Sequence, residues 1–135
     1  MRRRKATAQQ RALRLRIDGC NDPAQLAAIA EAWVEDQPAL AARAYRKAAA
    51  AAGEDGVIHN NLGVACWNMG NKGEARDAFR RAAILLPADR NVLENLAGVL
   101  VDLRCEEEAR EYFRRAAGLA RGRRTLLANV DLHGY

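Results

Sequence analysis

The sequence predicts an all-α protein, an α-solenoid of three helix-turn-helix hairpins with a C-terminal capping helix. Composition is one reason: half of the 135 residues are hydrophobic, only 5% are aromatic, and much of the apolar content is alanine, the strongest helix former. Periodicity is the other, because three series of residues recur every 34 positions. The series are Tyr45, Phe79 and Phe113; Ala41, Ala75 and Ala109; and Ala48, Ala82 and Ala116. A period of this length is typical of stacked helical hairpins.

Each hairpin is predicted from its own spacing, in the units 22–55, 56–89 and 90–123. In the middle unit a first helix is indicated by Ile58, Leu62, Ala65 and Met69, which recur at helical intervals. Residues 70–73, Gly-Asn-Lys-Gly, predict a turn. A second helix follows, with Ala75, Ala78, Phe79, Ala82 and Leu85, and ends before Pro87. Two such short helices bury their apolar faces only by stacking on the next pair.

The flanking segments complete the predicted domain organisation. Residues 1–21 are predicted to be a basic N-terminal arm. Residues 124–135 are predicted to be a C-terminal capping helix and tail, because Leu126, Leu127, Val130 and Leu132 keep the helical spacing. A second interpretation makes 131–135 a short signal that a partner reads.

The middle unit resembles the signature of the tetratricopeptide repeat family. The matching positions are Leu62, Gly63, Gly70, Ala75, Phe79, Ala82 and Pro87. His59 stands where the family has a tryptophan, and Arg121 replaces the closing proline of the third unit. The first unit is degenerate, but the resemblance covers 22–123. Packing then predicts that Gly63 and Ala97 let paired helices touch, and that Phe79 and Phe113 are core residues between neighbouring units.

The resemblance implies a concave groove, lined by the first helix of each unit, that receives a peptide from another protein. The candidate partner-binding residues at the matching positions are Trp33, Asn60, Asn61, Val64, Trp67, Asn68, Asn91, Glu94, Asn95, Asp102 and Asn129. The predicted function is a protein–protein interaction adaptor or a chaperone-like subunit. No lysine or arginine falls on these positions, which argues against a clamp for a C-terminal carboxylate.

Two features of the predicted groove each allow two interpretations. Asn61, Asn95 and Asn129 are each one repeat apart and predict a ladder of amides, whose donors and acceptors suit an extended peptide backbone; alternatively they only fix the local backbone. Trp33 and Trp67 have the same spacing. They are predicted either to anchor a partner through their large contact area or to pack between adjacent helices.

The net charge of +5 is concentrated in the arm. Residues 1–17 contain seven basic residues and no acid, which leaves 15 basic against 17 acidic residues, about −2, for the rest of the chain. The arm has three interpretations: a solvated tail, a segment that contacts nucleic acid or an anionic membrane through phosphate charge, or a cap docked on the first unit through Leu13, Leu15 and Ile17. The second gives the alternative function, a structural subunit of a larger complex.

Catalytic, metal and cofactor chemistry are not expected. Cys20, Cys66 and Cys105 are far apart in the sequence, so neither a disulfide nor a zinc site is predicted, and Cys66 is expected to be a buried, inert thiol. The sequence has no Gly-rich phosphate loop, and the acidic run 106–108 indicates the start of a helix. No apolar run approaches the roughly 18 residues of a membrane span. The sequence therefore predicts a cytoplasmic protein that is not an enzyme.

Overall fold

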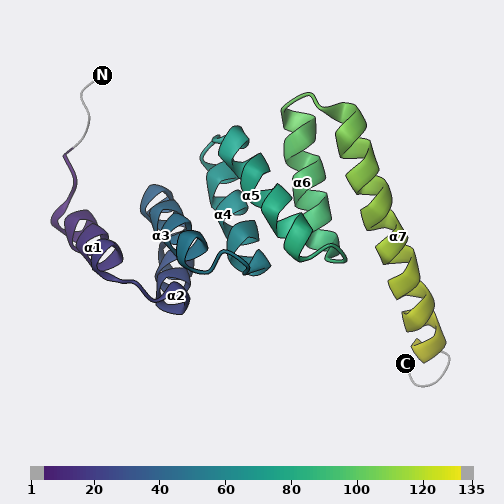
Figure 1. Ribbon diagram of the computed structural model, residues 1–135, viewed down its shortest axis with the longest axis horizontal. Helices are drawn as coiled ribbons and strands as arrows, with labels where there is room; N and C mark the ends of the chain where they lie inside the picture. The colour runs from purple at the N-terminus through teal and green to yellow at the C-terminus, as the bar shows by residue number, and fades with distance from the viewer. Residues whose placement is uncertain (1–4, 132–135) are drawn as a thin grey trace.

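The computed structural model describes residues 5–131, and the side chains of residues 5–119. This part of the chain contains seven helices and no strand: α1 (Ala8–Gly19), α2 (Pro23–Trp33), α3 (Pro38–Ala51), α4 (Gly56–Asn68), α5 (Lys72–Leu85), α6 (Arg90–Asp102) and α7 (Glu106–Asp131). Successive helices lie side by side in one row, with α1 and α7 at opposite ends of the row (Figure 1). Three hairpins, α2–α3, α4–α5 and α6–α7, stack one on the next. The predicted all-α solenoid is confirmed.

An aspartate caps the N-terminus of the first helix of every hairpin. The carboxylates of Asp22, Asp55 and Asp89 accept hydrogen bonds from backbone N–H groups at the starts of α2, α4 and α6, which satisfies donors that the helix itself leaves unpaired. The turn after α4 needs a left-handed residue, and Gly70 supplies it with a φ of 80°. At the same position of the next repeat stands Arg104, with a φ of 61°.

The core lies between the two helices of each hairpin and between neighbouring hairpins. Phe79 is fully buried, and its ring lies so close to Gly63 that a Cβ on this glycine would come within 2.5 Å of it. The prediction that Phe113 is also a core residue is wrong, because its side chain is 44% exposed. Ala97 stands where the preceding unit has Gly63, and no helix of the described residues follows α7.

The N-terminal segment is a helix of the array. Leu13 and Ile17 of α1 are buried, whereas Leu15 is 72% exposed, and α1 packs on α3. Lys47 of α3 donates from Nζ to the carbonyl oxygens of Ile17 (3.2 Å) and Asp18 (2.6 Å) at the end of α1, groups that a helix C-terminus leaves without partners. Residues 8–19 are therefore docked on the first unit through Leu13 and Ile17, but Leu15 takes no part in the contact. Residues 1–4 lie outside the described residues.

The last helix continues past the point where a separate helix was expected. α7 runs without a break from Glu106 to Asp131, whereas the sequence analysis placed a distinct capping helix at 124–135. The physical reason is the absence of a helix breaker, since Arg121 occupies the position where Pro87 closes the preceding unit. The tail 132–135 lies outside the described residues.

Candidate functional site

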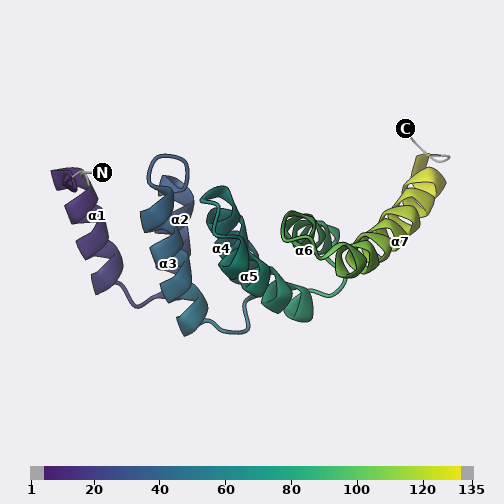
Figure 2. The same ribbon diagram turned by 90° about the horizontal axis from the view of Figure 1, so that it is seen from above.

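The candidate site is the inner face of the array, which we define as the predicted partner-binding residues that α2, α4 and α6 carry. Figure 2 shows the row of helices bending, with α4 and α6 on the inner side of the bend and α5 on the outer side. Most of the predicted partner-binding residues lie on these three helices. Asn68, Asn91 and Asp102 are exposed, and the following are half-buried: Trp33, Asn60, Asn61, Val64, Trp67, Glu94 and Asn95.

Two side-chain hydrogen bonds join α4 directly to α6 across the inner face. Asn95 donates from Nδ2 to Oδ1 of Asn60 at 3.0 Å, and the indole N–H of Trp67 donates to Oδ2 of Asp102 at 2.7 Å. In both pairs the partners are separated by 35 positions in the sequence, one more than the repeat length. In these two contacts, the residue of α4 therefore bonds a position one further along in the following repeat.

The asparagine ladder has a different register from the predicted one. Asn95 is bonded to Asn60, where the repeat spacing had aligned it with Asn61. Asn61 is half-buried on the same helix. The third predicted member, Asn129, has a side chain outside the described residues. The structure thus brings two of the predicted amides together and leaves Asn61 beside them.

The two tryptophans, although equivalent in the repeat, differ in their surroundings. Trp67 meets Phe79 edge-on, with 6.0 Å between ring centroids, and its ring lies over Gly98, where a Cβ would come within 2.6 Å. Trp67 therefore packs between α4 and α6, with its polar group bonded to Asp102. Trp33 also packs against the core, but within the described residues no hydrogen bond joins its indole to Asn68, the residue at the matching separation.

Charged groups are concentrated at the α6 end of the inner face. Glu94 forms an ion pair with Arg90, one turn earlier on α6, at 2.9 Å, and the carboxylate of Asp102 accepts from Trp67. Sequence reasoning missed Arg90, although its spacing of four residues from Glu94 is typical of an ion pair on a helix. The inner face is thus mainly amide and apolar, with an acidic end.

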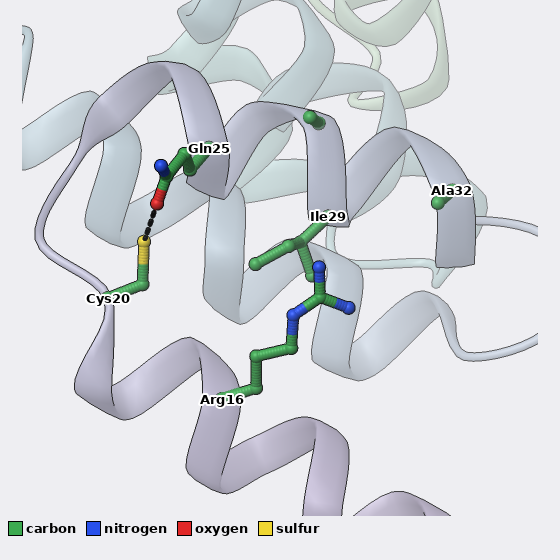
Figure 3. A pocket seen from close by; sticks show the side chains of 6 residues that line it. Arg16, Cys20, Gln25, Ile29 and Ala32 are labelled. Atoms are coloured by element: carbon green, nitrogen blue, oxygen red, sulfur yellow. Dashed lines mark hydrogen bonds between the residues drawn. The ribbon is translucent and has the colours of Figure 1, made fainter.

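A cleft between α1 and α2 was not anticipated from the sequence. It has a volume of about 460 Å³ and is lined by Arg16, Cys20, Gln25, Ala28, Ile29 and Ala32. Figure 3 shows the Arg16 side chain reaching from α1 toward Ile29 on α2, and the Cys20 thiol donating to the Gln25 side-chain oxygen at 3.6 Å. The cleft exists because α1 leans on α3.

In the described part of the chain, no three histidine, cysteine or acidic side chains are grouped so as to hold a metal ion. None of the helices described combines the length and the apolar character needed to cross a bilayer.

The fold defines a class of protein, an α-solenoid of helical hairpins. The family model described as tetratricopeptide repeat matches residues 57–89, which form the middle hairpin. The middle hairpin is thus a tetratricopeptide repeat, and the hairpins on either side of it are arranged in the same way.

Several solved structures have a similar arrangement of helices. A mutant of MamA is 27% identical, with a TM-score of 0.68 and coverage of 81% of both chains. Another MamA structure, labelled AMB-1, is 28% identical with a TM-score of 0.72, and this chain spans 58% of its length. The second TPR of Spaghetti (RPAP3), bound to the HSP90 peptide SRMEEVD, is 16% identical with a TM-score of 0.69 and shares the fold. No curated protein sequence matches the chain at a significant level.

Proposed function

We propose that this chain is a protein–protein interaction adaptor whose inner face binds an extended or helical segment of a partner protein. The observation that carries the proposal is the chemical make-up of this face. Half-buried or exposed amides, such as Asn61, Asn68 and Asn91, lie beside apolar groups such as Val64 and Trp33. Amides match the donors and acceptors of any peptide backbone, and the apolar groups offer contact area.

The inner face is also held in place before a partner arrives. The Asn60–Asn95 and Trp67–Asp102 hydrogen bonds tie α4 to α6. A surface that is already ordered loses less conformational entropy on binding than a flexible one. This favours α4 and α6 as the firm part of the site, while the Trp33 side chain on α2 is the better candidate for an aromatic anchor because its indole N–H is not bonded to Asn68.

The charges on the inner face indicate the kind of segment it would accept. Glu94 and Asp102 are acidic, and Arg90 is already paired with Glu94. A neutral or basic segment therefore suits the α6 end better than an acidic one. The second TPR of Spaghetti (RPAP3) is bound to the HSP90 peptide SRMEEVD, which supports peptide binding by this fold but not the same charge preference.

The proposal is tested by affinity capture from native lysate with identification by mass spectrometry, followed by titration of the captured partner's segment as a synthetic peptide. The chain contains only two tryptophans, both on first helices, so their fluorescence should change as the peptide binds. The triple variant Asn61→Ala, Asn68→Ala, Asn91→Ala should lose the peptide, and the control Asn21→Ala, in the loop before α2, should keep it. Equal binding by both variants would move the interface away from the inner face.

A second candidate function is favoured by the basic outer helices. Dibasic pairs recur once per repeat on α3, α5 and α7: Arg46 and Lys47, Arg80 and Arg81, Arg114 and Arg115. Arg46 and Arg80 also form ion pairs with Glu74 and Glu108. Helix α1 carries three further exposed arginines, Arg11, Arg14 and Arg16. We propose as an alternative that the chain is a structural subunit whose basic side contacts nucleic acid or an anionic membrane.

Retention on a single-stranded RNA resin and on phosphatidylserine vesicles, measured at rising salt, tests this alternative. Contacts with phosphate charge weaken steeply as salt increases. The triple variant Arg11→Gln, Arg14→Gln, Arg16→Gln should reduce retention, whereas Arg104→Gln, in the loop before α7, should not. Lack of retention on both supports at low salt would remove the alternative.

A further inference from the structure

Helix α7, the second helix of the last hairpin, has an exposed face that its counterpart α5 does not have. Phe113 is 44% exposed and Ala117 is exposed, whereas Phe79 and Ala83, at the same repeat positions of α5, are 0% and 6% exposed. The difference arises because α6 packs on α5, while no helix in the described residues packs on α7 in this way. We call Arg110, Phe113 and Ala117 the α7 face.

Helix α2, the first helix of the first hairpin, also has an exposed face that its counterparts α4 and α6 do not have. Ala28 and Ala32 of α2 are exposed. At the same repeat positions, Leu62 and Cys66 of α4, and Leu96 and Leu100 of α6, are all buried. The preceding second helix packs on α4 and on α6, but α1 leans on α3 and leaves the cleft described above in front of α2. We call Ala28, Glu31 and Ala32 the α2 face.

We propose that the α7 face of one copy of the chain docks on the α2 face of a second copy, with Phe113 entering the cleft beside Ile29. Between copies, this contact repeats the packing of a second helix on the following first helix, which α3 makes with α4 and α5 makes with α6 within the chain. Burial of apolar surface on both sides drives the association. The exposed Arg16 side chain, which reaches across the cleft (Figure 3), turns aside to admit the ring.

Charge complementarity selects this pairing over the two symmetric ones. The α7 face carries Arg110 and the α2 face carries Glu31; both side chains are exposed, and neither forms an ion pair with another of the described residues. Opposite charges meet when the α7 face docks on the α2 face. Pairing of two α7 faces, or of two α2 faces, would bring like charges together, which is unfavourable.

Such a contact uses two different surfaces, so it does not close on itself at a dimer. A dimer still presents one free α7 face, on one copy, and one free α2 face, on the other, because the two faces lie near opposite ends of the row of helices (Figure 1). Contacts of this heterologous kind build rings or open chains of copies. The inner faces of successive copies would then form one longer surface.

Sedimentation velocity and light scattering of the full chain, from about 1 μM to about 1 mM to cover weak as well as moderate affinities, provide the first test. The average mass should rise with concentration past that of a dimer. A constant monomer mass over this range, or a plateau at the dimer, would overturn the proposal.

Three matched variants locate the contact. Ala28→Glu and Ala117→Glu each place a charge on one face at an exposed position, so each should remain monomeric while folding normally by circular dichroism. Ala39→Glu makes the same change at an exposed position of α3 outside both faces and should associate like the parent chain. An equimolar mixture of the first two variants should form dimers and nothing larger, because one copy keeps its α7 face and the other its α2 face. Association of either variant alone, or a mixture that stays monomeric, would contradict the assigned pairing.

Discussion

The guanidinium of Arg46 on α3 donates two hydrogen bonds to the carboxylate of Glu74 on α5, at 2.6 Å and 2.8 Å, and so ties one repeat to the next. The tie recurs at the same positions of the following repeat, where Arg80 donates to Glu108 at 2.6 Å. The acidic run at the start of α7 thus has a role beyond the helix dipole, because its last member is the repeat equivalent of Glu74. Consecutive second helices are held together on the outer side of the array by the same ion pair.

This ion pair predicts a loss of stability in acid. The hydrogen bonds from Arg46 are the main cause that lowers the pKa of Glu74 below its ordinary 4.5, and those from Arg43 lower the pKa of Asp18 below 3.8. A lowered folded-state pKa means that the unfolded chain binds protons first, so stabilisation present above about pH 4.5 is lost as the pH falls.

Urea unfolding at a series of pH values measures the effect. Glu74→Gln should flatten the acid limb of the stability curve and cost at most about 1 kcal/mol near neutral pH, because the pair is partly exposed. Glu54→Gln, an exposed carboxylate in the loop before α4, serves as the control. An acid limb unchanged in the Glu74 variant would show that other groups cause it.

The close contact at Gly63 predicts a strong effect of a single methyl group. In Gly63→Ala the new Cβ would lie 2.5 Å from ring carbons of Phe79, and this ring is held in turn against Trp67. We expect a destabilisation of about 1–3 kcal/mol from overpacking, seen as a lower unfolding midpoint. Gly73→Ala, in the same repeat with no atom within 4 Å of the new Cβ, should be neutral or slightly stabilising.

The left-handed backbone of Arg104 predicts a stabilising substitution. Its φ of 61° is unfavourable by about 1–2 kcal/mol for a residue with a Cβ, and the equivalent residue of the preceding repeat is Gly70. Arg104→Gly should therefore raise the free energy of unfolding by about 0.5–1 kcal/mol, after the greater entropy of glycine in the unfolded chain is subtracted. Thermal unfolding tests this, and a lower melting temperature in the variant would contradict it.

Docking of α1 predicts opposite outcomes for two of its apolar residues. Ile17 is fully buried, and Ile17→Ala should destabilise the protein by about 2–4 kcal/mol. Leu15 is 72% exposed, and Leu15→Ala should change stability by less than about 0.5 kcal/mol. Chemical denaturation of both variants decides between a docked helix and a solvated tail, for which the two substitutions would be equally harmless.

The three cysteines are expected to react at different rates. Burial is the main cause that raises the pKa of the Cys66 thiol to about 11, so it has very little thiolate near neutral pH, and thiolate is the reactive form. Cys20 and Cys105 are half-buried. A thiol reagent applied to the folded protein should label these two and leave Cys66 unmodified until urea is added. Labelling of all three at one rate would contradict the burial of Cys66.

The sequence could predict on which helices the candidate site residues lie, but not which of their side chains pair. The repeat period placed Asn60, Trp67, Asn95 and Asp102 on first helices, because it reports which turn of which helix a residue occupies. It could not reveal that Asn95 bonds Asn60 rather than Asn61, or that Asp102 takes the indole N–H of Trp67. These pairings depend on the shift by one residue between neighbouring first helices, a property of how the hairpins stack.

The sequence by itself determined the number, order and approximate limits of the repeated helices, since helix periodicity and turn residues act over a few neighbouring positions. Only the tertiary structure decided that α1 docks on α3, that Phe113 is exposed where Phe79 is buried, and that a cleft opens beside α2. Burial of a residue depends on which helix packs over it, and at the two ends of a repeat array the local pattern is the same as in the middle while the covering neighbour is missing or displaced.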